Sequence, residues 1–208
     1  MKALLAQTRS ELMLSLRNGE QLLVNIAIPL LLLVFFSAVK VLPIPTGVDK
    51  RVDFLAPGII ALAVMSNAMV ALAIGTGFER HYKVLKRLGA TPLGRGRWVL
   101  AKIGMVKILL IVQIALIVVA AFALGWNPGG TPWLAIPAVV LGAFAFGGIG
   151  LLMAGTLRGT VTLALANGLY LLLLLLGGMI IPFSEMPGFL GTIGKVLPSG
   201  ALSQVLQS

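Results

Sequence analysis

The sequence predicts an all-α integral membrane protein. The chain has 208 residues, of which 59% are hydrophobic and 11% are charged, and its mean hydropathy is +1.05. Soluble domains carry about 25% charged residues, and a soluble core of this length could not bury so much apolar surface. The apolar residues also fall in long runs between short charged segments, which is the pattern of helices that cross a bilayer.

The charge and the rare residue types narrow the function further. A net charge of +10 can indicate a nucleic-acid partner. Here the basic residues stand at the ends of apolar runs, so the expected partner is the lipid bilayer and not nucleic acid. The chain has no cysteine and a single histidine, His81, which excludes a disulfide framework, a thiolate metal site and any site that needs two histidines.

Residues 1–20 are expected to form a helix that lies in the cytoplasmic interface. Leucines and a methionine share a broad face of the helical wheel. The polar residues on the opposite face are Gln7, Glu11, Arg17 and Asn18. Arg9 falls among the leucines, which makes the amphipathic pattern loose. The pattern favours an interfacial helix, and the alternative is an ordinary charged lead-in to the first span.

Five apolar runs are long enough to cross a bilayer as helices, since a span needs about 20 apolar residues. They predict spans at residues 21–39, 54–78, 99–125, 133–156 and 160–181. The sequence WNPGGTPW at 126–133 separates the third span from the fourth, with a tryptophan at each edge, as is common at a membrane boundary. In the loop 40–53, Pro43 and Pro45 are expected to prevent a helix.

The basic residues predict the orientation of the spans. Eight of the sixteen lysines and arginines lie between Phe78 and Lys107. The N-terminal segment, the loop 79–97 and Arg158 fall on one side of the membrane, and short loops rich in lysine and arginine stay in the cytoplasm. We therefore expect one multi-pass transmembrane domain, residues 1–208, with a cytoplasmic N-terminus. The loop 40–53, with three basic residues, is the one observation against it.

Residues 182–208 contain no continuous apolar stretch that could span the membrane, because Pro182, Pro187 and Pro198 divide them. One reading is an external loop. The other is a pair of short helices that dips into the outer leaflet, which is allowed where neighbouring helices bury the backbone.

No residue pattern in the chain indicates catalysis or an ion pathway. All six acids fall in loops or at the edges of spans, whereas an ion relay usually needs an acid or histidine inside the membrane. Lys102 and Lys107 lie near the cytoplasmic end of the third span, where a lysine can extend to the interface. The sequence also lacks a phosphate-binding loop. We therefore expect a chain that is not an enzyme, holds no cofactor or metal, and receives its energy from elsewhere.

Small residues recur at four-residue spacing in the fourth span, at Ala138, Gly142, Ala143, Gly147 and Ala154. Such spacing lets helix backbones approach closely, so it predicts helix packing within the chain or a dimer. A groove for a substrate is the second reading.

Residues 78–90 are expected to form a short helix in the basic loop. Glu79 and Lys83 are one turn apart in the favourable orientation for an ion pair. Gly89 is a plausible end for the helix. Leu88 can face the membrane surface while the basic residues point outward. Charge alone leaves two readings open, a docking element and a solvated loop.

The sequence FERHYKVLKRLGATPLGRGRWVLAK, from Phe78 to Lys102, resembles the loop between spans two and three in permeases of the type-2 ATP-binding-cassette exporter family. An acid–arginine pair, a leucine-rich basic turn, Thr-Pro-Leu and a downstream lysine follow in the order that is typical of this family. The segment after Gly177 is similar to an external re-entrant hairpin of the same family. The resemblance covers the whole chain and is closest to drug-exporter permeases of the daunorubicin-resistance type.

This resemblance implies a transport subunit that works as a homodimer or heterodimer above two nucleotide-binding ATPase subunits, which carry the ATP and Mg. Residues 78–97 would be the coupling loop. The residues expected to dock the ATPase are Glu79, Arg80, Lys83, Lys86, Arg87 and Leu88, together with Arg9 and Arg17 on the N-terminal helix. A substrate path would lie between two permease subunits, and the apolar spans suit a hydrophobic or amphiphilic cargo of the drug or lipid class.

The family also has a sixth span after the hairpin, and no apolar run before Ser208 supplies it. We therefore expect the natural chain to continue. Two other functions stay open at this point. The first is a non-transporting scaffold or immunity protein that binds a partner or anionic lipid through the basic loop. The second is a carrier driven by an ion gradient.

Overall fold

A computed structural model describes residues 2–39, 50–89, 94–129 and 132–207. Every regular element in these ranges is a helix, so the expected all-α class is confirmed for the part of the chain that the structure describes. The helices are α1 (Lys2–Arg17), α2 (Gly19–Ala38), α3 (Arg51–Met65), η1 (Ser66–Ala71), α4 (Leu72–His81), α5 (Val84–Gly89), α6 (Gly94–Ala123), α7 (Pro132–Thr156), α8 (Gly159–Leu176), η2 (Phe183–Glu185), α9 (Gly188–Val196) and α10 (Pro198–Gln207).

Four helices in the described ranges are long and apolar enough to cross a membrane. They are Arg51–His81, Gly96–Ala123, Trp133–Thr156 and Gly159–Leu176, at the positions of the second to fifth expected spans. The first expected span corresponds to α2, whose apolar helical part, Asn25–Ala38, is shorter. The crossing expected at residues 21–39 therefore stays a prediction. Parts of the expected loops, 40–49, 90–93 and 130–131, lie outside the described residues.

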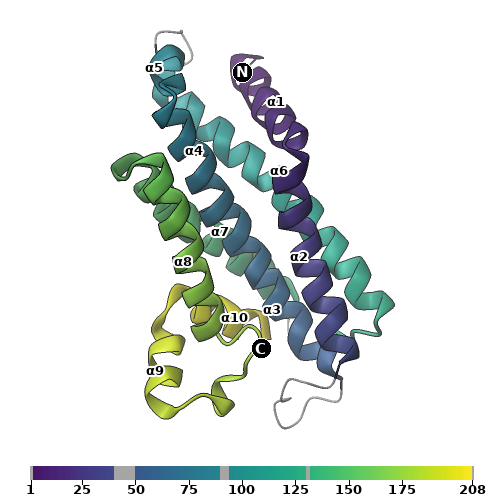
Figure 1. Ribbon diagram of the computed structural model, residues 1–208. Helices are drawn as coiled ribbons and strands as arrows, with labels where there is room; N and C mark the ends of the chain where they lie inside the picture. The colour runs from purple at the N-terminus through teal and green to yellow at the C-terminus, as the bar shows by residue number, and fades with distance from the viewer. Residues whose placement is uncertain (1, 40–49, 90–93, 130–131, 208) are drawn as a thin grey trace.

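The second span forms the centre of the bundle. It is one continuous helix from α3 through η1 to α4, and 78% of its apolar window is buried. Helices α7 and α8 pack along one side of it, and α2 and α6 pack along the other (Figure 1). The other three spans are mostly exposed, with 17–28% of their windows buried. The apolar side chains on those outer faces have the chemistry that lipid contact requires.

The middle of the second span is a π-helix, η1, within otherwise α-helical geometry. A π turn widens the backbone, and such turns often mark functional sites in membrane and soluble helices. Here the turn carries Ser66 and Asn67, and both are buried.

The small residues of the fourth span pack inside the chain, as one of the two sequence readings predicts. An ideal Cβ on Gly150 would lie 2.7 Å from the carbonyl oxygen of Met69 in η1. A Cβ on Gly142 would lie 3.0 Å from the side chain of Leu202 in α10. The approach of Gly150 to backbone atoms needs glycine and holds α7 against the central span, whereas Gly142 packs α7 on α10.

Replacing Gly150 with alanine should therefore destabilise the protein by about 1–3 kcal/mol, because the methyl group meets backbone and not a movable side chain. Helix propensity alone would favour alanine by about 1 kcal/mol, so the contact decides the sign. Thermal unfolding in detergent measures the effect. The matched control is Gly148→Ala on the same helix, where the added Cβ meets nothing within 4 Å. Equal melting of the two variants would contradict the close packing of α7 on η1.

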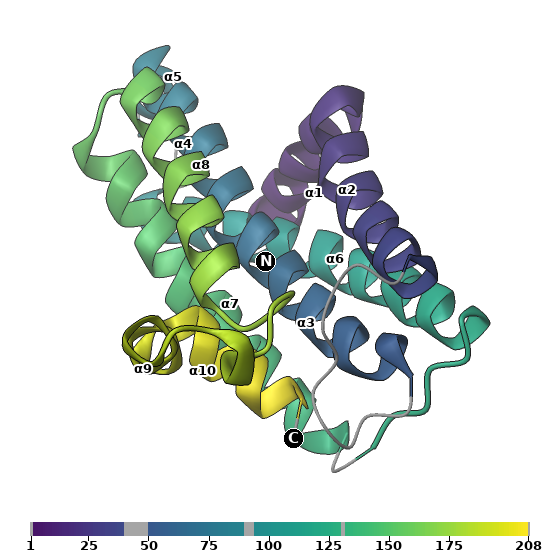
Figure 2. The same ribbon diagram turned by 60° about the horizontal axis from the view of Figure 1, so that its bottom comes forward.

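The end of the chain forms a pair of short helices, α9 and α10, which pack together and against α3, α7 and α8. The Ser203 hydroxyl donates to the carbonyl oxygen of Gly177, and the Gln207 amide donates to that of Gly178 at 3.2 Å. These bonds fasten α10 to the residues that follow α8. The helix pair lies toward the end of the molecule opposite to α5 (Figures 1 and 2). Its entry into a membrane leaflet stays a prediction.

Candidate functional site

The basic loop begins with the end of the second span, and its helix differs from the expected one. Helix α4 continues to His81, and Lys83 then adopts a left-handed backbone with φ of 59°. A second helix, α5, starts at Val84 and ends at Gly89. The expected single helix over 78–90 is therefore wrong in its start, because the apolar span simply runs on through Phe78. A non-glycine residue with positive φ is uncommon and marks a fixed turn.

Helix α5 presents its basic residues outward. The side chains of Lys83, Lys86 and Arg87 are exposed, and no residue of α5 is buried. Leu88 is half-buried. The turn before α5 is held by Tyr82, whose ring stacks on Phe78 at 6.1 Å between ring centroids. This short, exposed and positively charged helix is thus joined directly to the central span.

Glu79 contacts a lysine other than the expected one. Its Oε1 accepts from Nζ of Lys102, on α6, and the described structure gives no pair with Lys83. Lys102 also binds Oε2 of Glu11, on α1, at 2.5 Å. Only 3% of the Lys102 side chain is exposed, so the expectation that this lysine extends to the interface is wrong. Lys107, one turn and a half further along α6, is exposed as expected.

Glu11 also lies elsewhere than its helical wheel suggested. It is 4% exposed, and its second oxygen accepts from Nε2 of Gln7 at 2.9 Å. The apolar side chains of Leu5 and Leu14 are instead 67% and 62% exposed. Helix α1 therefore turns its acid toward α6, because a buried ammonium there needs a counter-charge. The leucine face that remains outside still suits an interfacial helix.

The cluster of Glu11, Glu79 and Lys102 ties three helices together. It joins α1, α4 and α6 at the level where the central span meets the basic loop. Burying one ammonium between two carboxylates is costly unless all three keep their partners, so the cluster fixes the relative position of these helices.

Arg80 binds the fourth span instead of projecting freely. Its guanidinium donates to the carbonyl oxygens of Ala154 at 3.2 Å and Leu157 at 3.1 Å. These carbonyls belong to the last turn of α7 and the residue after it, where a cation also interacts favourably with the helix dipole. Arg80 thus ties α4 to the end of α7, and contact with a partner stays a prediction for it.

The two arginines expected from the N-terminal helix, Arg9 and Arg17, are both exposed. The chain changes direction at Asn18, between α1 and α2 (Figure 2). The start of α1 lies at the same end of the molecule as α5 (Figure 1). Glu79 and Arg80 are neighbours on α4. Within the described ranges, the basic residues of α5 make no ion pair. A docking role for all eight expected residues stays a prediction.

A second polar group lies deeper among the spans, and sequence reasoning missed it. Asn67 donates to Oε1 of Gln113, whose Nε2 donates to the carbonyl oxygen of Asn25 at 2.7 Å. The Ser66 hydroxyl lies 3.4 Å from Oδ1 of Asn25. Side chains of this kind hydrogen-bond across membrane helices. One signal was available: Gln113 follows Lys102 by eleven residues, about three helical turns, so both must share a face of α6.

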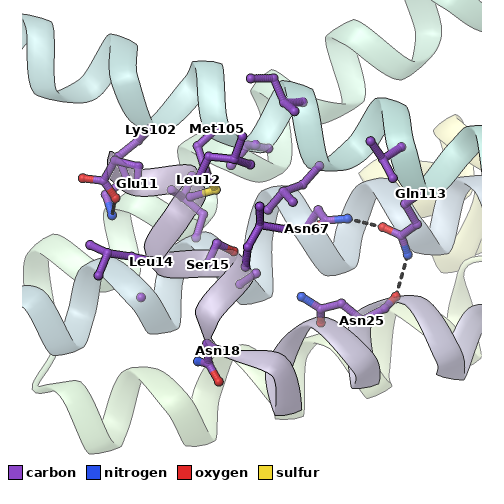
Figure 3. A pocket seen from close by; sticks show the side chains of 18 of the residues that line it. Glu11, Leu12, Leu14, Ser15, Asn18, Asn25, Asn67, Lys102, Met105 and Gln113 are labelled. Atoms are coloured by element: carbon purple, nitrogen blue, oxygen red, sulfur yellow. Dashed lines mark hydrogen bonds and ion pairs between the residues drawn. The ribbon is translucent and has the colours of Figure 1, made fainter. Parts of the chain in front are cut away.

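A cavity of about 370 Å³ separates the two polar groups. Figure 3 shows Glu11 and Lys102 at one end of it and the Asn67–Gln113–Asn25 hydrogen bonds at the other. Apolar side chains line the wall between them, including Leu12 and Met105 (Figure 3). The cavity thus has a charged end, an apolar wall and an amide end.

These features define an integral membrane protein built as a helical bundle, with a basic loop at one end of its central span. The family model described as ABC-2 type transporter matches residues 2–207, and the chain belongs to this family. The family resemblance is thereby confirmed, and the chain is a membrane transport subunit. Family membership also implies an ATPase subunit as its partner.

One curated relative is the protein named "Putative transport permease YvfS" of Bacillus subtilis (strain 168). It is 27% identical over 208 residues, and the alignment covers 96% of this chain and 82% of the relative. No solved structure matches the chain significantly.

Proposed function

We propose that the chain is the membrane-spanning subunit of an ATP-driven exporter in a bacterial plasma membrane. It would form a homodimer or heterodimer with a second permease subunit. A separate nucleotide-binding subunit would dock on α5 and hydrolyse ATP with its own Mg. The cargo would be a hydrophobic or amphiphilic molecule of the drug or lipid class, and the N-terminus would be cytoplasmic.

The observation that carries this proposal is the construction of α5. It is an exposed helix with Lys86 and Arg87 on its surface, joined through the left-handed turn at Lys83 to the central span. A helix that packs loosely on its own chain but is joined to the core can be displaced by a bound partner and can transmit that displacement to the core. Its positive charge suits an acidic groove on that partner.

Ion pairs and hydrogen bonds next to α5 would transmit such a displacement to the spans. Glu79 and Arg80 lie at the last turn of α4, one or two turns from α5. Glu79 connects α4 to α6 and α1 through Lys102, and Arg80 connects it to α7. Movement of α5 would therefore displace three other helices together, because packed helices with fixed partners move as rigid bodies.

The double variant Lys86→Glu/Arg87→Glu should abolish docking of the ATPase subunit, because the exposed face of α5 then changes sign. We expect loss of export and of ATPase stimulation by at least about tenfold, with unchanged membrane insertion and thermal unfolding. Co-purification with the ATPase subunit and transport into inverted vesicles measure the two effects.

The matched control is Lys195→Glu on α9, an exposed lysine of the terminal helix pair, far from α5. It should leave docking and export intact. Normal co-purification and export by the α5 double variant would overturn the coupling role. Co-purification of the wild-type chain with lipid alone, without ATPase stimulation, would instead support the scaffold reading.

The substrate class rests on the outer surface and on the cavity walls, which are apolar over most of their area. Such walls would accept an apolar molecule from the bilayer more readily than a sugar or a small ion, because they offer few polar groups to offset the free energy cost of desolvating polar or charged solutes. Competition between a lipophilic dye and candidate cargoes for ATP-dependent accumulation in inverted vesicles tests the class and the direction together.

A further inference from the structure

The outward side of α1 carries a stripe of arginines and apolar side chains, which we call the outer stripe. Its members follow one another at four-residue spacing, so they share one side of the helix, and all are exposed: Leu5, Arg9, Met13 and Arg17. Leu16 is exposed on the same side. Neither Arg9 nor Arg17 makes a hydrogen bond or an ion pair within the described structure.

An ion pair on the opposite side of α1 fixes this orientation. Glu11, the one acid of α1, is buried and accepts from Nζ of Lys102 at 2.5 Å. The outer stripe therefore carries two arginines and no acid of α1. The next acid in the chain, Glu20, belongs to α2, and its side chain lies outside the described residues.

The length of α6 places this ion pair at a membrane boundary. Trp126 follows the far end of α6, and tryptophan favours the membrane–water boundary. The hydrocarbon core takes about 20 helical residues, so the second boundary falls near residue 106. Lys102 lies outside that point by about 6 Å along the helix axis, and the headgroup layer is about 5–8 Å thick. The pair of Glu11 and Lys102 is therefore level with the lipid headgroups.

Helix α7 gives the same boundary independently. About 20 residues counted from Trp133, near its start, reach residue 153. The next carbonyl oxygen, that of Ala154, accepts from the guanidinium of Arg80 at 3.2 Å. Glu79 precedes Arg80 and binds the lysine of the ion pair, so the two counts place the boundary at the same level of the bundle.

Both arginines of the outer stripe lie near this headgroup layer. Nε2 of Gln113 donates to the carbonyl oxygen of Asn25 at 2.7 Å, which sets α2 beside α6, and the two helices run in the same direction (Figure 1). Arg17 precedes Asn25 by about two turns, as residue 106 precedes Gln113, so Arg17 lies at the hydrocarbon boundary. Arg9 lies further out, half a turn before the acid that binds α6.

We propose that the outer stripe binds an anionic phospholipid of the leaflet next to the basic loop. The guanidiniums of Arg9 and Arg17 donate to its phosphate oxygens, and Met13 and Leu16, which lie between them, contact the upper part of its acyl chains. Arginine suits this role, because its planar guanidinium can form two parallel hydrogen bonds with a phosphate. These two arginines then contact lipid and not the ATPase subunit. Lipid binding needs no ATP, so the proposal can fail while the export function stands, and the reverse also holds.

Native mass spectrometry of the full chain in detergent tests the lipid class. The probes are phosphatidylglycerol and phosphatidylethanolamine with identical acyl chains, so that only the headgroup differs. A basic side chain at a membrane surface contributes about fivefold in affinity, so we expect phosphatidylglycerol to bind at least about tenfold more tightly. Inorganic phosphate should not displace it, since phosphate lacks the acyl chains that the apolar residues contact.

Two double variants with the same change of charge separate this site from the net charge of the chain. Arg9→Gln/Arg17→Gln should remove the preference for phosphatidylglycerol and leave co-purification with the ATPase subunit unchanged. Lys86→Gln/Arg87→Gln removes two charges from the exposed surface of α5 and should keep the preference. Thermal unfolding verifies that both variants are folded.

A single label measures whether the outer stripe touches lipid, because the chain has no cysteine of its own. A bimane group on Met13→Cys should be quenched in vesicles by phosphatidylglycerol brominated near the top of its acyl chains. The same group on Lys86→Cys, on α5, is the control and should not be quenched.

Equal affinity for the two lipids would overturn the proposal, as would an unchanged preference in Arg9→Gln/Arg17→Gln. Loss of ATPase co-purification in that variant would show that the outer stripe binds the ATPase subunit instead. A label at residue 13 that escapes the brominated lipid and is shielded by a second permease chain would overturn the proposal too.

Discussion

Replacing Lys102 with methionine should cost about 3–5 kcal/mol of stability, the largest effect of a single substitution that the structure predicts. The variant removes the one ammonium between Glu11 and Glu79 and leaves two carboxylates close together, one of them 5% exposed. Each then has to take up a proton or remain as an unpaired buried charge. We expect a lower melting temperature in detergent and weaker ATPase coupling, since α1, α4 and α6 lose their common partner.

Two variants establish that the effect comes from charge and not from the loss of the lysine stem. Lys107→Met removes an exposed lysine of the same helix and should melt as the wild type does. The triple variant Lys102→Met/Glu11→Gln/Glu79→Gln removes all three charges and should recover most of the stability, because a neutral cluster has no unpaired ion to bury. If Lys102→Met melts like Lys107→Met, the cluster does not hold the three helices together.

Replacing Gly200 with alanine should destabilise the terminal helix pair by about 3 kcal/mol. A Cβ at this position of α10 would lie 1.9 Å from the carbonyl oxygen of Gly194 in α9 and 2.8 Å from its carbonyl carbon. Both are backbone atoms, so the two helices would have to separate. Limited proteolysis and thermal unfolding in detergent both measure the loss.

The control for this variant is Gly188→Ala at the start of α9, where the added Cβ meets nothing within 4 Å. It should leave protease resistance and melting unchanged. Unchanged protease resistance in Gly200→Ala would show that α9 and α10 do not pack as closely as the structure describes. Export activity of the same variant measures how much transport depends on the helix pair.

Much of the architecture could be predicted because a bilayer imposes a simple rule on sequence. A helix that spans a membrane must be apolar over about 20 residues, so the helices at 51–81, 96–123, 133–156 and 159–176 could be read directly. Proline and glycine marked the turns and the boundaries of the short terminal helices, because both residues interrupt regular helix geometry. The small-residue spacing of the fourth span predicted close packing, and Gly142 and Gly147 are packed within the chain, against Leu202 of α10 and Ala68 of η1.

The site was harder to predict, because its members come from helices that are distant in sequence. Glu79 has a lysine four residues ahead of it, and local spacing favoured that pair. The observed partner, Lys102, is 23 residues away on another helix. The other carboxylate of the cluster, Glu11, is 91 residues from Lys102. A helical wheel compares residues within one helix only, so it placed Glu11 on an outer face. The amides at Asn67 and Gln113 escaped notice because they carry no charge.

The sequence by itself therefore determined the membrane class, the positions of four spans, the basic loop and the family resemblance. Each of these depends on residues that are close together in the chain. Only the tertiary structure decided that Lys102 is buried between two acids and that Arg80 binds the end of α7. It also decided that a cavity lies between the charged cluster and the hydrogen-bonded residues Asn67, Gln113 and Asn25. The physical reason is that a buried charge takes the counter-charge that packing brings nearest to it, and packing of separate helices is not encoded in local spacing.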